Sequence, residues 1–233
     1  EHLSAASGFL MEKELNYLQG VLTEPRRPLV ALIGGAKVAD KMGLLNNLLN
    51  IVDSLLMAGG MANTFLKAKG YAMGNSLLEE DKVPLAEDLI KTAAKKNIPL
   101  VLPKDLVGAE EFKEGQIGIT VSADKLPAGH MALDIGPETV EEFSKYIKEA
   151  GTVVWNGPVG AFEVPPFDKG NNAVAKEIAK MPGISIIGGG DVVAAVHEAG
   201  LASQMTHIST GGGATLEYLE GKELPGLTCL DEA

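Results

Sequence analysis

Two lysines placed just after a glycine pair are the residues of this sequence whose types and spacing first suggest chemistry. The run Gly35–Lys41 follows an apolar stretch and carries Lys37 and Lys41 four positions apart. If a helix begins at once, both lysines lie on one helix face, where like charges repel each other. A helix N-terminus preceded by glycines also attracts anions. The pattern therefore indicates either a bound phosphate or two solvated surface lysines.

Glycines follow apolar runs at three further places. The four clusters are Gly34–Gly35, Gly59–Gly60, Gly188–Gly190 and Gly211–Gly213. Any one cluster is explained by a tight turn. Together, four strand ends without side chains favour a large flat or phosphorylated ligand that touches bare backbone.

Polar residues near these glycines have two interpretations each. Asp191 precedes a helical pattern, so its carboxylate either caps that helix or holds Mg²⁺ together with phosphate oxygens. Ser209 and Thr210 can add hydroxyl donors to an anion site at Gly211–Gly213. Asn156 is typical of a turn and Glu163 of a solvated loop.

Several familiar sites are missing from the sequence. There is no G-x-x-x-x-G-K-[ST], and no G-x-G-x-x-G is followed by an acidic residue about 20 positions later. A G-x-S-x-G elbow is also missing, and Cys229 has no evident activating partner. The histidines lack metal-ligand spacing; they are His2, His130, His197 and His207.

Length and composition limit the class of protein. A chain of 233 residues with 45% hydrophobic content suits one large α/β domain or two small ones. Its net charge of −11 argues against nucleic acid or an anionic membrane as the main partner. The single cysteine fits a reducing cytosol, and no apolar run is long enough to span a bilayer.

The apolar patterns predict alternating strands and helices. Strands are expected at 29–33, 53–57, 98–102, 152–155, 184–187 and 206–208. Helices are expected at 8–22, 38–49, 79–96, 139–150, 192–199 and 214–219, with others ending near residues 69 and 180. Residues 103–135 are predicted to form a small antiparallel β excursion. This alternation predicts an α/β fold with a doubly wound, six-stranded parallel sheet and helices on both faces.

The chain resembles the carboxyl-terminal, nucleotide-binding domain of the phosphoglycerate kinase family. The segments that carry the resemblance are Gly8–Leu15, Gly34–Lys41, Trp155–Gly160, Gly188–Asp191 and Ser209–Ala214. It implies that residues 1–233 are this domain, that 8–22 form the interdomain helix, and that Glu1 falls near the domain junction. The family's amino-terminal domain, which binds 3-phosphoglycerate, has no counterpart here.

The resemblance also implies a role for each matching residue. Lys37 would stabilise the phosphoryl group in flight, Lys41 would hold the terminal phosphates, and Asp191 would bind Mg²⁺. Glu163 would take the ribose hydroxyls, and Asn156 would sit near the phosphates. The adenine slot would be lined by Gly35, Ala36, Gly59, Gly60, Leu77 and Leu133. The remaining nucleotide contacts would be Gly188, Gly189, Gly190 and Val192, with Gly211, Gly212 and Gly213 presenting N–H groups to the moving group.

Two positions depart from the family pattern. Val192 stands where the family usually has Ser or Thr, which removes a hydroxyl donor. Ala58 replaces the first glycine of a Gly-Gly-Gly run, and its methyl group is expected to narrow the adenine slot.

The activity implied by the resemblance is Mg²⁺-dependent, reversible phosphoryl transfer between 1,3-bisphosphoglycerate with ADP and 3-phosphoglycerate with ATP. We expect a cytoplasmic monomer, with this chain alone binding MgADP or MgATP but turning over little or no 3-phosphoglycerate. One alternative is a non-catalytic nucleotide-binding module, which the loss of a hydroxyl at Val192 favours. A second is a Rossmann-type oxidoreductase.

Overall fold

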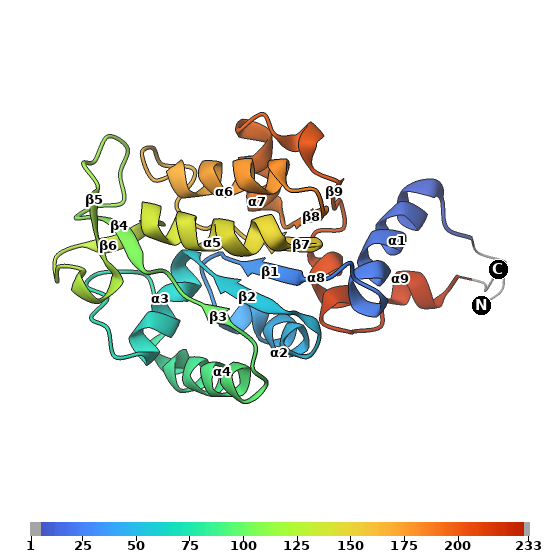
Figure 1. The fold of residues 1–233 in the computed structure, drawn as a ribbon, viewed down its shortest axis with the longest axis horizontal. Helices are drawn as coiled ribbons and strands as arrows, with labels where there is room; N and C mark the ends of the chain where they lie inside the picture. The colour runs from blue at the N-terminus through green and yellow to red at the C-terminus, as the bar shows by residue number, and fades with distance from the viewer. Residues whose placement is uncertain (1–5, 231–233) are drawn as a thin grey trace.

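A parallel sheet of six strands forms the centre of the computed structural model, which describes residues 6–230 (Figure 1). Glu1 and His2, which entered the sequence predictions, lie outside the described residues. The strands, in the order β3-β2-β1-β7-β8-β9 across the sheet, are Leu100–Val101, Ser54–Met57, Leu29–Ile33, Thr152–Asn156, Ile184–Gly188 and His207–Ile208. The predicted six-stranded parallel sheet is confirmed.

Helices cover both faces of this sheet. They are α1 (Phe9–Thr23), α2 (Met42–Ile51), α3 (Gly59–Ala68), α4 (Val83–Lys95), α5 (Pro137–Glu149), α6 (Lys169–Lys180), α7 (Gly190–Glu198), α8 (Gly213–Leu219) and α9 (Pro225–Thr228). Short 3-10 turns precede α2 at Ala39–Lys41 and α4 at Glu80–Lys82. Within residues 6–230, no helix is long and apolar enough to cross a lipid bilayer.

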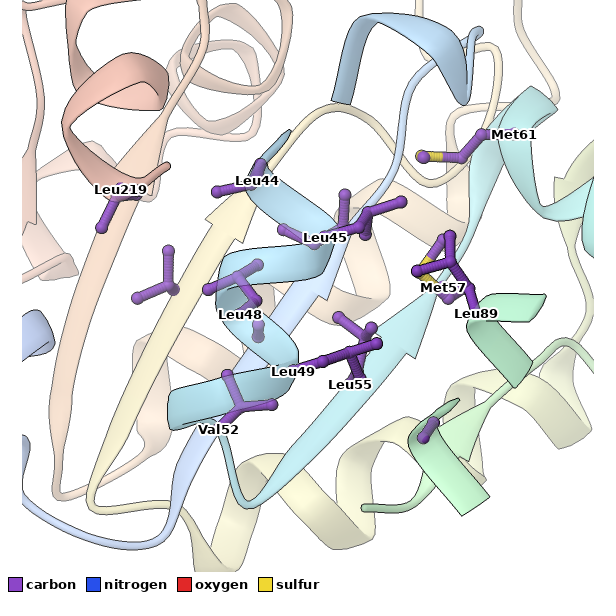
Figure 2. Packing of buried hydrophobic residues seen from close by; sticks show 14 of the residues in the cluster. Leu44, Leu45, Leu48, Leu49, Val52, Leu55, Met57, Met61, Leu89 and Leu219 are labelled. Atoms are coloured by element: carbon purple, nitrogen blue, oxygen red, sulfur yellow. The ribbon is translucent and has the colours of Figure 1, made fainter. Parts of the chain in front are cut away.

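Alternate residues of β1 belong to two different hydrophobic cores, one on each face of the sheet. Ala31 and Ile33 pack with the apolar faces of α1, α2, α3, α4 and α8, whereas Val30 and Leu32 pack with α5, α6 and α7. Figure 2 shows the first core, where the leucines of α2 meet Leu55 and Met57 of β2. A strand that is buried on both faces must be apolar throughout, which explains the continuous run Leu29–Ile33.

A second, antiparallel sheet lies beyond α3 and α5. Its strands are β5 (Ile119–Ser122), β4 (Asp105–Ala109) and β6 (Met131–Ile135), in that order. This sheet confirms the predicted excursion at 103–135.

The sequence Thr139-x-x-Glu142 has the spacing of a capping box, which predicts that Thr139 opens the helix to Ala150 as its capping residue; this prediction is wrong. Helix α5 begins at Pro137, and the Thr139 hydroxyl accepts from the backbone N–H groups of Lys104 and Asp105, at 3.0 and 3.1 Å. The Asp105 carboxylate accepts from the N–H groups of Glu138 and Thr139 at 3.0 and 2.8 Å. A buried carboxylate from β4 thus satisfies the free donors of this helix start, which leaves Glu142 no capping role.

The strand order places a switch point between β1 and β7. From β1 the chain adds β2 and β3 on one side, and from β7 it adds β8 and β9 on the other. Ligands of open α/β sheets bind beyond the carboxyl ends of the strands at such a point. A ligand site is therefore expected just after Ile33 and Asn156.

Candidate functional site

A cavity of about 680 Å³ opens at the carboxyl ends of the central strands, between the two sheets. Eight of the residues singled out in the sequence line it: Gly35, Ala36, Gly59, Gly60, Leu77, Leu133, Glu163 and Asp191. Other wall residues carry no local signal of function in the sequence, among them Asn63, Leu106, Phe112, Met131 and Phe162. They come from α3, from the small sheet and from the loop after β7, and only the fold brings them together.

Backbone segments meet closely at the switch point. Gly34 N–H donates to the Asn156 carbonyl at 2.9 Å, and Gly35 N–H donates to the Pro158 carbonyl at 2.8 Å. Gly59 has a φ of +66°, and a Cβ there would lie 2.7 Å from the backbone nitrogen of Gly35. Glycine is required at Gly34 and Gly59 because a Cβ there would meet backbone atoms, and the same lack of side chains leaves one cavity wall bare.

Lys41 points into this junction. Its ammonium donates to the Gly34 carbonyl at 2.8 Å, to the Asn156 carbonyl at 3.3 Å and to Asn156 Oδ1 at 2.5 Å. Asn156 Nδ2 in turn donates to the Gly188 carbonyl at 2.8 Å. Burial lowers the pKa of Lys41 to about 8, although the charges of Asp191 and Asp40 oppose the shift. The structure thus brings three predicted site residues together, with the lysine bound to protein acceptors.

The expectation that Lys37 and Lys41 share a helix face is wrong. Helix α2 begins only at Met42, and Lys37 lies exposed in the preceding loop. The helix is displaced because Glu79 Oε2 accepts the N–H groups of Val38, in a short hydrogen bond, and Ala39, at 3.2 Å. An anion does bind these amides, as the glycine–helix pattern predicted, but it is a carboxylate of the chain itself.

The fourth glycine cluster lies apart from the cavity. Gly211, Gly212 and Gly213 are not among its lining residues. The neighbouring Thr210 donates its N–H and hydroxyl to Glu14 Oε1, at 2.7 and 2.9 Å. Glu14 Oε2 lies 3.0 Å from His207 Nε2. Burial raises the pKa of Glu14, but the hydrogen bonds from Thr210 and His207 outweigh it and lower that pKa overall. These contacts join α1 to the segment that follows β9.

The two departures from the family pattern both place side chains in the core. Val192 and Ala58 belong to the second hydrophobic cluster and are fully buried. Ala58 does not line the cavity, so its methyl group does not narrow it. Val192, which is also expected to contact the nucleotide, is likewise not among the residues that line the cavity.

Asp191 places a carboxylate at the cavity that can bind a cation. It is exposed in the first turn of α7 and makes no hydrogen bond within residues 6–230. In the same part of the chain, no group of three or more His, Cys, Asp and Glu side chains is placed to hold a metal. A lone carboxylate suits Mg²⁺, which keeps its waters and takes further ligands from phosphate oxygens.

Asp134 is a buried acid at the cavity wall. It is 4% exposed and accepts the N–H groups of Gly170, at 2.7 Å, and Ile135, at 2.9 Å. Burial raises its pKa to about 7; these hydrogen bonds and Lys169 act against the shift, and Asp168 adds to it. Asp134 therefore connects β6 to the start of α6 and titrates near neutral pH.

The titration of Asp134 should make the free energy of unfolding depend on pH. Between pH of about 4 and 7 the native protein keeps a proton that the unfolded chain has released, so the free energy of unfolding falls as pH rises through this window. Asparagine cannot titrate, so from pH 5 to 8 the free energy of unfolding of wild type should fall relative to Asp134→Asn by about 1–3 kcal/mol. Urea unfolding of both proteins at the two pH values measures this, and parallel pH profiles would contradict it.

A doubly wound sheet with a glycine-walled cavity at its switch point defines an α/β protein with a ligand site of nucleotide size. The comparisons with known proteins make this specific. A family model described as phosphoglycerate kinase matches residues 1–222, and the chain belongs to the phosphoglycerate kinase family.

The relatives are close but longer. Phosphoglycerate kinase of Moorella thermoacetica is 55% identical over 231 residues, which are 99% of this chain and 59% of the relative. That of Roseiflexus sp. (strain RS-1) is 53% identical, over 99% of this chain and 58% of the relative. The structure of phosphoglycerate kinase from Coxiella burnetii matches with a TM-score of 0.92 and 44% identity, over 94% of this chain and 57% of that one. The chain thus spans under two thirds of the length of these relatives.

Proposed function

We propose that this chain is the nucleotide-binding half of a phosphoglycerate kinase, and that MgADP or MgATP occupies the cavity. The observation that carries the proposal is the cavity itself, which lies at the switch point with bare backbone on one wall and Leu77 and Leu133 among its apolar residues. A flat base fits between glycine backbone and leucine side chains, and its phosphates then reach the loops after β1 and β8.

We assign each residue a role from its position relative to the cavity. Glu163, at the cavity, takes the ribose hydroxyls. Asp191 holds Mg²⁺ on the phosphates, and the metal neutralises charge on them when bound. The exposed Lys37 is free to meet the transferred phosphoryl group, whereas Lys41 must exchange one of its protein acceptors for a phosphate oxygen.

The reaction needs little from the protein beyond position and charge. The phosphoryl group moves from the acyl phosphate of 1,3-bisphosphoglycerate to the terminal oxygen of ADP, and the carboxylate that leaves is already stable as an anion. No general base is therefore required in the reverse direction, and fixed positive charge is the main catalytic contribution. The family's 3-phosphoglycerate site lies in its amino-terminal domain, so we propose that this chain supplies only the nucleotide side, as a cytoplasmic monomer.

Titration calorimetry and a coupled assay on the 233-residue chain test the proposal. We expect MgADP to bind, NADH not to bind, and turnover of 3-phosphoglycerate to be at or near background. Absence of MgADP binding would overturn the nucleotide site, and NADH binding would favour an oxidoreductase. A kcat similar to that of full-length relatives would show that the second substrate also binds here.

The non-catalytic alternative needs a separate experiment. Fusion of this chain to the remaining part of the Moorella thermoacetica relative supplies a second domain. Turnover by the fusion, lost on Lys37→Ala, would support the kinase, whereas a fusion that binds MgADP without turnover would support the non-catalytic module.

A further inference from the structure

Asn63 brings a polar side chain into the largely apolar wall of the cavity. It lies on α3, one helical turn beyond Gly59 and Gly60, and is only 2% exposed. Its Nδ2 donates a 3.0 Å hydrogen bond to the carbonyl oxygen of Leu77, which lines the same cavity.

The contact with Leu77 fixes how the amide is turned. Because a carbonyl oxygen can only accept, Nδ2 faces Leu77 and Oδ1 takes the other side. Within residues 6–230, Oδ1 of Asn63 has no hydrogen-bond partner. The fully enclosed side-chain atoms without a partner in that range are His130 Nδ1 and Glu220 Oε2, so Oδ1 of Asn63 still touches open space. A buried residue with an unpaired acceptor at a cavity wall is poised to accept from a ligand.

We propose that Asn63 selects the base of the nucleotide: its Oδ1 accepts a hydrogen bond from the 6-amino group of adenine, so the cavity prefers 6-aminopurine to 6-oxopurine nucleotides. The inference rests on the proposed nucleotide site, since Gly60 and Leu77 border both Asn63 and the slot assigned to the base. A 6-oxopurine turns an oxygen toward Oδ1, which leaves two acceptors facing each other without a proton. In nucleic-acid recognition, too, asparagine Oδ1 accepts from the 6-amino group of adenine, although there Nδ2 also donates to N7.

The test compares MgADP with MgIDP, whose hypoxanthine base carries an oxygen at position 6. Titration calorimetry on the 233-residue chain should show MgADP binding about tenfold more tightly, the factor that one hydrogen bond of ordinary strength provides. In Asn63→Ala the ratio should fall to about one, through a loss of MgADP affinity. Asn46→Ala removes an exposed asparagine from α2 and should keep the wild-type ratio.

The possible outcomes separate the inference from the function on which it rests. Equal affinities for the two nucleotides in the unaltered chain would overturn the role of Asn63 and leave the nucleotide site standing. A chain that binds neither nucleotide would overturn both. A wild-type ratio in Asn63→Ala would also overturn the inference, and because the first comparison needs no variant, poor folding of Asn63→Ala does not remove the test.

Discussion

Replacing Lys41 with alanine should weaken MgADP binding by roughly 10- to 100-fold. The reason is that the ammonium lies at the switch point, between the loop after β1 and the end of β7, where the phosphates of the proposed nucleotide must pass. A hydrogen bond from a charged group contributes about 1.5–3 kcal/mol when it is lost from a partly buried site. Titration calorimetry of the variant and the wild type measures the difference.

Two further variants test whether the loss of affinity comes from the charge of Lys41. Lys95→Ala removes an exposed lysine at the end of α4 that does not line the cavity, and it should leave the affinity unchanged. Because the pKa of Lys41 is about 8, MgADP affinity should fall as pH rises from 7 to 9 in the wild type. Lys41→Arg stays charged over this range and should flatten that dependence. An unchanged affinity in Lys41→Ala would mean that the ammonium only joins β1 to β7.

The sheet and the glycine-edged strand ends could be predicted because each depends on local sequence. A strand such as Leu29–Ile33, buried on both faces, is apolar at every position, and the glycines that follow it are visible in the same few residues. The cavity at the switch point then follows from the strand order alone.

The contacts that shape the site could not be predicted because they join distant residues. Glu79 displaces the start of α2 by binding Val38 and Ala39, some forty positions earlier in the chain. Lys41 turns inward because Asn156, more than a hundred positions later, offers it two oxygens. No spacing rule connects such pairs, so local periodicity alone predicts that the two lysines share one helix face.

Gly34→Ala should lower the free energy of unfolding by about 3 kcal/mol, the upper part of the range for overpacking a filled space. A Cβ at this position would clash with the carbonyl oxygen of Pro158 and lie 2.7 Å from that of Gly157. Both are backbone atoms, and the hydrogen bonds of Gly34 and Gly35 to this segment keep the segment from moving away from the added Cβ. Urea unfolding followed by circular dichroism measures the change.

The same substitution at Gly20 is the matched control. Gly20 lies inside α1, and a Cβ added there would meet no atom within 4 Å, so alanine should stabilise by up to about 1 kcal/mol through helix propensity. Trp155, the single tryptophan, is fully buried and donates to the Gly157 carbonyl at 2.9 Å, so its fluorescence reports on the junction directly. If Gly34→Ala were as stable as wild type, the segment after β7 would move aside at little cost. The close approach of the β1 and β7 ends would then not be what holds the cavity wall in place.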